Sequence, residues 1–157
     1  MTVYLALGTN LGERQSHLQQ ARILIAGKIG RFSAISSIYE TEPWGFESKN
    51  KFLNQVVAVE TNLSPLEIID LTQEIERQIG RMGKTVHSYQ DRLIDIDLIL
   101  YGDTIVNTKK LQLPHPLFHK RHFVLEPLHE IAPDLVHPVL GKTVKELWGF
   151  GKFENTF

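Results

Sequence analysis

The sequence contains no cysteine among its 157 residues. Disulfide bonds and cysteine-based zinc sites are therefore excluded, and the absence favours a reducing compartment. The chain also has no apolar run approaching the roughly 18 residues of a membrane-spanning helix. Its N-terminal apolar stretch, Val3–Leu7, is too short for a signal peptide and follows no basic residue. We therefore expect a soluble, cytoplasmic protein without a membrane partner.

The chain also lacks a large excess of positive or negative residues, since its net charge at pH 7 is -1. A protein that coats nucleic acid needs a strong positive balance, so a nucleic-acid partner is not expected. The basic residues are unevenly spread, however, because seven of the 17 lie between positions 81 and 121. A local basic cluster suits a small polyanion better than a long one, although a solvated surface explains it equally well.

The spacing of apolar and turn-forming residues predicts an α+β fold. Four stretches rich in apolar and β-branched residues are typical of strands, and two longer stretches with helical spacing are typical of helices. Ser64-Pro65-Leu66-Glu67 begins the second helix with a capping box. The expected strands are Val3–Leu7, Phe32–Glu40, Leu53–Thr61 and Leu93–Tyr101, and the expected helices are 13–29 and 65–80.

In chain order these elements give β-α-β-β-α-β, the pattern of a ferredoxin-like sandwich with helices on an antiparallel sheet. A small hairpin (104–106 with 110–113) and short C-terminal helices, around 117–125 and after a capping box at 143–146, are expected to follow. The 42% hydrophobic content and the absence of repeats or linkers indicate one domain spanning 1–157. A fold of this class alone says little about function.

Asp95 and Asp97 are the most informative pair of residues. Because side chains alternate along a strand, both carboxylates project from one face, about 6.5 Å apart along the backbone. Aspartate is disfavoured in strands, and two like charges in apolar surroundings repel each other. A divalent cation removes this conflict, and Mg²⁺ prefers one or two carboxylates together with phosphate oxygens. The pair predicts a magnesium site; the alternative is the solvated side of an edge strand.

Cationic and aromatic side chains accompany this pair. Arg92 precedes it, and His115 and Arg121 follow it; such groups hold phosphate oxygens and lower the barrier to phosphoryl transfer. Phe52 and Phe123 could stack a flat heterocycle between them, although two ordinary core residues would look the same. A further polar side chain, that of Asn54, adds a donor and an acceptor for the edge of such a ring.

Other nucleotide and metal motifs fail. Gly141-Lys142-Thr143 ends like a P-loop, but Val136 stands where that motif needs its first glycine. The segment Gly8–Gly12 is not a dinucleotide fingerprint. A zinc site built from the three histidines between 115 and 122 is disfavoured, because a proline interrupts their spacing and no cysteine is available.

Several short motifs follow one another along the chain, and together they are more specific than any one alone. They are 6–12 (ALGTNLG), 37–43 (SIYETEP), 52–54 (FLN), Glu76 with Gly80-Arg81, 92–97 (RLIDID), 114–116 (PHP) and 121–128 (RHFVLEPL). With these motifs, the chain over about residues 2–138 resembles the 6-hydroxymethyl-7,8-dihydropterin pyrophosphokinase family. The chain departs from the pattern at 87–91, where the family commonly has a Trp-Gly-Pro-like run, and at 82–83, where a loop arginine is missing.

The resemblance implies a ferredoxin-like enzyme of folate biosynthesis that uses ATP and two Mg²⁺ ions. It implies in-line attack by the hydroxymethyl oxygen of 6-hydroxymethyl-7,8-dihydropterin on the β-phosphorus of ATP, with AMP leaving. ATP and the pterin are then the partners, and a monomer is the working expectation. The implied catalytic residues are Arg81, Arg92, Asp95 and Asp97, and the two aspartates hold the metal. The implied ATP contacts are Gln73, Glu76, Lys110, His115 and Arg121. The implied pterin contacts are Asn10, Thr41, Pro43, Phe52, Asn54 and Phe123.

Two other functions stay open. A ferredoxin-like RNA-binding module would use exposed sheet aromatics and basic residues. The paired acids argue against it, because they repel phosphate unless a metal is bound. A metal-dependent hydrolase or nucleotidyltransferase could use the same two aspartates, and its products would distinguish it: released phosphate or a nucleotidyl adduct in place of AMP and a pterin diphosphate.

Overall fold

The computed structural model describes residues 1–42, 51–82 and 93–154, with the backbone alone for 81–82 and 150–154. The strands and helices follow one another along the chain in the predicted order, except that the second predicted strand is divided in two. The strands are β1 (Thr2–Thr9), β2 (Arg31–Ile35), β3 (Tyr39–Thr41), β4 (Phe52–Glu60), β5 (Asp95–Tyr101), β6 (Val106–Asn107) and β7 (Gln112–Leu113). The helices are α1 (Arg14–Lys28), α2 (Pro65–Met82), the 3₁₀ turn η1 (Phe118–Lys120), α3 (His122–Ile131) and α4 (Val144–Glu154).

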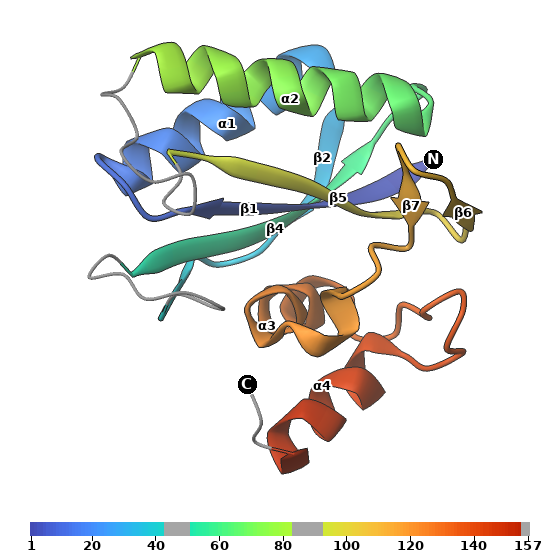
Figure 1. The fold of residues 1–157 in the computed structure, drawn as a ribbon. Helices are drawn as coiled ribbons and strands as arrows, with labels where there is room; N and C mark the ends of the chain where they lie inside the picture. The colour runs from blue at the N-terminus through green and yellow to red at the C-terminus, as the bar shows by residue number, and fades with distance from the viewer. Residues whose placement is uncertain (43–50, 83–92, 155–157) are drawn as a thin grey trace.

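The main sheet has the order β2-β4-β1-β5, and β3 pairs with β4 beside β2. Every pairing is antiparallel, which confirms the ferredoxin-like prediction. Helices α1 and α2 cover one face of the sheet, while α3 lies on the other face with α4 packed outside it (Figure 1). The predicted small hairpin is present as β6 and β7.

Alternation along the strands divides the core into two layers. Val3, Leu5 and Leu7 of β1 are buried and pack beneath α1 and α2. The intervening side chains of β1, among them Tyr4 and Ala6, pack toward α3. Because β1 and β4 are covered on both faces, β4 is buried along nearly its whole length. The site described below lies on the α3 face.

The strand predicted over Phe32–Glu40 is divided in two. Its middle residue, Ser36, donates its N–H to the Val56 carbonyl (2.9 Å), and its hydroxyl accepts from the Val56 N–H (3.0 Å). The hydroxyl oxygen thus takes the place of a backbone acceptor, so the chain bends here while β2 and β3 both stay paired with β4.

Two helix boundaries also differ from the prediction. The second long helix does not stop at Gly80 but continues to Met82. The helix expected around 117–125 is a 3₁₀ turn followed by α3, with Arg121 in an extended conformation between them. Both predicted capping boxes are confirmed. The carboxylates of Glu67 and Glu146 accept hydrogen bonds from the backbone N–H of Ser64 and Thr143, respectively. The backbone N–H of each glutamate donates in return to the hydroxyl of that serine or threonine. Within the described ranges, no helix has the length and apolarity needed to cross a membrane.

Gly30 joins α1 to β2 at a point where the backbone of β4 approaches closely. A Cβ at this position would overlap the Glu60 carbonyl oxygen, which is backbone and cannot move aside cheaply. We expect Gly30→Ala to destabilise the fold by about 2–4 kcal/mol in urea unfolding. The matched control is Gly27→Ala on the exposed side of α1, where a Cβ meets nothing within 4 Å; it should stabilise by about 0.5–1 kcal/mol. Equal effects from the two substitutions would contradict this account.

Candidate active site

One row of cross-strand neighbours crosses the sheet at the heart of the site. Gly8 of β1 is paired with Asn54 of β4 on one side and with Asp95 of β5 on the other. Residues paired in this way point to the same face, here the face toward α3. Two strand spacings separate Asn54 from Asp95, about 10 Å. Gly8 has no side chain, and a Cβ there would lie 3.6 Å from the Asn54 Oδ1 and 3.8 Å from the Phe52 ring.

Asp95 and Asp97 lie on the same face of β5, as the sequence predicts. Both are half-buried, and Asp97 is paired with Ala6, which packs in the α3 layer. The residue between them, Ile96, is buried on the opposite face. The strand is at the edge of the sheet, but its acids are not fully solvated. Two neighbouring carboxylates in partly apolar surroundings carry a repulsion that a bound cation would relieve.

Glu76 adds a third carboxyl group to this edge. It extends from α2 and accepts a hydrogen bond from the Ile96 N–H at 2.8 Å. Burial is the main cause that raises the pKa of Glu76 to about 7. The carboxyls of Asp95 and Asp97 raise that pKa further, while the hydrogen bond from Ile96 opposes the shift. Glu76 therefore holds its proton to a higher pH than an ordinary glutamate, and its hydrogen bond with Ile96 supports β5.

His115 and Arg121 bring positive and donor groups to the same side. The backbone N–H of His115 donates to the Ile99 carbonyl at 2.9 Å, so this segment runs beside β5. Burial, with a smaller contribution from the Arg121 charge, lowers the pKa of His115 to about 4. Its Nδ1 accepts from the Leu117 N–H at 3.3 Å, so the proton of the neutral ring is on Nε2. His115 is thus a neutral donor, and Arg121 is the cation.

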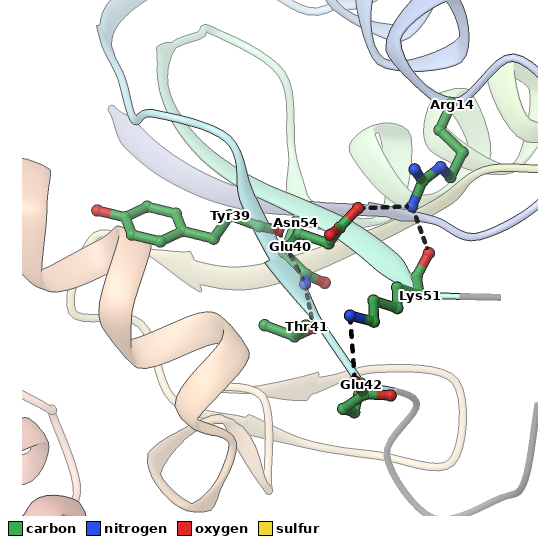
Figure 2. Close-up of polar contacts among 7 residues, drawn as sticks. All are labelled: Arg14, Tyr39, Glu40, Thr41, Glu42, Lys51 and Asn54. Carbon is green, nitrogen blue, oxygen red and sulfur yellow. Dashed lines mark hydrogen bonds and ion pairs between the residues drawn. The ribbon is translucent and has the colours of Figure 1, made fainter. Parts of the chain in front are cut away.

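A separate group of side chains lies across Gly8 from the carboxylates. The Asn54 amide donates to the Thr41 hydroxyl at 2.6 Å and, at 3.4 Å, to the Tyr39 carbonyl (Figure 2). Phe52 is paired with Thr41, and both are half-buried. The other predicted ring, Phe123, is half-buried in the first turn of α3, with the Arg121 guanidinium 5.9 Å from its ring centre. The structure therefore brings hydrogen-bonding groups and aromatic rings to the α3 side of the sheet.

The remaining predicted site residues are less closely tied to this group. Asn10 is buried directly after β1. Gln73 and Lys110 are exposed, the first on α2 and the second in the turn between β6 and β7. The predicted Pro43 and Arg92 lie outside the described residues, and Arg81 is described by its backbone alone. Among the described residues, no group of three or more His, Asp or Glu side chains is arranged to hold a metal ion.

Sequence reasoning missed a carboxylate that holds β3 from the outside. Glu130 of α3 accepts hydrogen bonds from the Ser37 N–H (3.0 Å), the Ser37 hydroxyl (3.0 Å) and the Tyr39 hydroxyl (2.6 Å). Arg14 of α1 also contacts β3, because its guanidinium forms an ion pair with the Glu40 carboxylate at 3.2 Å (Figure 2). Ser37 and Glu130 are 93 positions apart, so no local pattern could have paired them.

Comparison with known proteins supports one family. Residues 4–133 match the model of the family described as 7,8-dihydro-6-hydroxymethylpterin-pyrophosphokinase. The 2-amino-4-hydroxy-6-hydroxymethyldihydropteridine pyrophosphokinase of Porphyromonas gingivalis is 48% identical over 138 residues, which cover 87% of this chain and 93% of that protein. The protein of the same name from Aquifex aeolicus is 41% identical over 155 residues, 99% of this chain and 92% of that one.

The chain also resembles solved structures of larger proteins. A Plasmodium falciparum HPPK-DHPS structure superposes with a TM-score of 0.77 at 18% identity, covering 99% of this chain and 46% of that one. This chain therefore spans less than half the length of that solved protein. At such low identity the match concerns the fold alone, and it agrees with the sheet order found here.

The raised pKa of Glu76 predicts a pH-dependent effect of removing its charge. Folding favours the protonated form, so stability from this group falls as the pH rises from about 4.5 toward 7. Glu76→Gln removes the charge and keeps an acceptor for the Ile96 N–H. In metal-free buffer, calorimetry should show a melting temperature several degrees above wild type at pH 8, at about 2–4 °C per kcal/mol, and a much smaller difference at pH 5. The same difference at both pH values would contradict this origin of the shift.

Proposed function

The chain belongs to the 7,8-dihydro-6-hydroxymethylpterin-pyrophosphokinase family, and from that premise we propose which residues carry out its reaction. It is an ATP-dependent diphosphotransferase of folate biosynthesis, acting on the hydroxymethyl group of the pterin. One observation carries the assignment of residues: the paired acids and the aromatic, amide-bearing group lie on one sheet face, on either side of Gly8. The RNA-binding, hydrolase and nucleotidyltransferase alternatives are not favoured by this relationship.

Asp95 and Asp97 would hold Mg²⁺, with two ions as the proposed number. Both aspartates are half-buried, and together with Glu76 they place three carboxyl groups at this edge; Asp95 and Asp97 contribute to the raised pKa of Glu76, although burial is its main cause. Two carboxylates, with water and phosphate oxygens at the other positions, are the ligand set that Mg²⁺ prefers. When bound, the ions would neutralise the phosphate chain and polarise the transferred phosphoryl group.

Arg121 and His115 would hold the phosphates of ATP beside these acids. The guanidinium supplies fixed charge in a planar fork, and the neutral His115 ring supplies a directed Nε2–H. Cations and donors placed where charge develops lower the barrier without reorganisation. Further contacts proposed from the family resemblance are Gln73, Glu76 and Lys110 to ATP, with Arg81 and Arg92 assisting transfer.

The pterin would lie on the opposite side of Gly8. Asn54 and Thr41 already share a hydrogen bond there, so their remaining donor and acceptor capacity is oriented for the edge of a heterocycle. Phe52 and Phe123 would stack on the ring, at about 0.5–1.5 kcal/mol for each aromatic pair. Asn10 and Pro43 are assigned to the same site by resemblance.

The proposed step forms a bond between the pterin hydroxymethyl oxygen and the β-phosphorus of ATP. The bond from that phosphorus to the oxygen bridging to the α-phosphorus breaks, AMP leaves with that oxygen, and the hydroxymethyl proton passes to solvent. None of the side chains described here is a strong base placed at the pterin side, so catalysis would rest on positioning and electrostatics. We further propose a single domain over 1–157 that acts as a cytoplasmic monomer on ATP and the pterin, without nucleic acid.

Asp97→Asn tests the metal-holding pair. The change preserves size and removes one charge, so the protein should stay folded by circular dichroism. AMP formation from ATP, Mg²⁺ and 6-hydroxymethyl-7,8-dihydropterin should fall at least about 100-fold, the loss expected when a charged group at the transferred phosphate is removed. Calorimetric titration with a non-hydrolysable ATP analogue should lose its dependence on Mg²⁺.

The matched control for Asp97→Asn is Asp103→Asn, an exposed acid just after β5. It should leave AMP formation unchanged. Turnover by Asp97→Asn at the wild-type rate would defeat the assignment, and so would a product other than AMP and the pterin diphosphate in the wild-type protein.

The assigned tautomer predicts how His115 tolerates substitution. Glutamine can present an N–H near the Nε2 position, whereas alanine cannot, so His115→Gln should keep a larger share of ATP affinity than His115→Ala. Because the pKa of His115 is about 4, the wild-type ring should show no protonation step between pH 5.5 and 8 in NMR spectra of its ring nitrogens. A midpoint near 6.5, or a proton found on Nδ1, would contradict the assignment.

A further inference from the structure

Strand β3 is held by side chains rather than by a core of its own. It is three residues long, and none of its residues is buried. Glu40 lies 3.2 Å from the Arg14 guanidinium of α1, and Thr41 accepts a hydrogen bond from Asn54 of β4 at 2.6 Å (Figure 2). The two contacts leave opposite sides of the strand, as alternation requires. Beyond its backbone pairing with β4, the position of β3 therefore depends on a few polar side-chain contacts.

The strongest of these contacts comes from Glu130. Its carboxylate accepts from the Ser37 N–H, the Ser37 hydroxyl and the Tyr39 hydroxyl, all within 3.2 Å. The hydrogen bond to Glu130 is the main cause that raises the pKa of Tyr39 to about 12, and the same contact lowers the pKa of Glu130. Both groups thus keep the protonation states that this bond needs across the physiological range.

Glu130 itself lies on a firmly anchored helix. Val124, Leu125 and Leu128 of α3 are buried in the core on this side of the sheet. The helix is therefore the fixed partner, and β3 is the dependent one. The same helix carries Phe123 in its first turn, so a tether from α3 to β3 sets the position of the strand relative to that ring.

We propose that Glu130 is a positioning residue for the pterin site. It holds Ser37 and Tyr39, and through them it keeps the Thr41 hydroxyl within hydrogen-bonding distance of the Asn54 amide, without touching substrate. The proposal rests on the pterin site proposed above. The two aspartates on β5, and His115, whose backbone N–H donates to Ile99 of β5, are separated from β3 by β4 and β1, so a loss of the tether acts on the pterin and spares ATP.

Glu130→Ala tests the tether in the full chain. The affinity for 6-hydroxymethylpterin, measured by fluorescence with Mg²⁺ and a non-hydrolysable ATP analogue present, should fall about tenfold, as for other supporting groups that act through a ligand-binding residue. The affinity for the ATP analogue should stay within about twofold, a difference of about 0.4 kcal/mol. Glu130→Gln, which keeps one acceptor oxygen, should lie between wild type and Glu130→Ala.

Glu74→Ala is the matched control, because Glu74 is likewise an exposed helix carboxylate with one partner, Lys28 at 3.2 Å, on the opposite face of the molecule. It should change neither affinity. Tyr39→Phe in the Glu130→Ala background should add little to the loss, since both changes break one contact. A pterin affinity within twofold of wild type in Glu130→Ala, or an equal loss for pterin and ATP, overturns the proposal.

Asn54→Ala separates this proposal from the placement of the pterin site. If that variant binds pterin as tightly as wild type, the pterin site lies elsewhere and the tether proposal falls with it. If Asn54→Ala weakens pterin binding and Glu130→Ala does not, the site stands and the tether alone is rejected. If both weaken pterin binding and spare ATP, the tether is supported.

Discussion

The antiparallel pairing of β1 with both of its neighbours is the constraint on which the site depends. It fixes Gly8 between Asn54 and Asp95, so the two halves of the site are held about two strand spacings apart by backbone hydrogen bonds. Gly8 contributes no side chain at this row, so the side chains of Asn54 and Phe52 are the ones nearest to it on this face. A rigid spacing of this kind suits a reaction that depends on positioning two substrates rather than on a strong acid or base.

The charge arrangement at β5 has a cost that binding would remove. Asp95, Asp97 and Glu76 meet at one sheet edge. Burial is the main cause of the raised pKa of Glu76, and the neighbouring carboxylates of Asp95 and Asp97 raise it further. A proton on Glu76 removes one of the three charges. The Mg²⁺ proposed above would instead favour the ionised form of all three groups, so its binding would be linked to release of that proton.

Much of the fold and part of the site followed from local patterns. The period-two alternation in β5 correctly placed Asp95 and Asp97 on one face, and capping boxes correctly began α2 and α4. The break at Ser36 was missed because a hydroxyl there replaces a backbone group, and composition does not reveal that exchange. The Glu130 tether was missed for a different reason: its partners are far away in sequence, and a lone exposed glutamate carries no local signal.

The helices on the two faces of the sheet differ in what they contribute. The layer of α1 and α2 packs on the face that carries most of the buried strand side chains, and it buttresses β5 through Glu76. The α3 layer covers only part of its face and contributes Phe123, Arg121 and Glu130 where that cover ends. A sheet that is sealed on one side and partly open on the other can keep its strands fixed while it exposes polar side chains to ligands. The stability of one face thus permits the chemistry of the other.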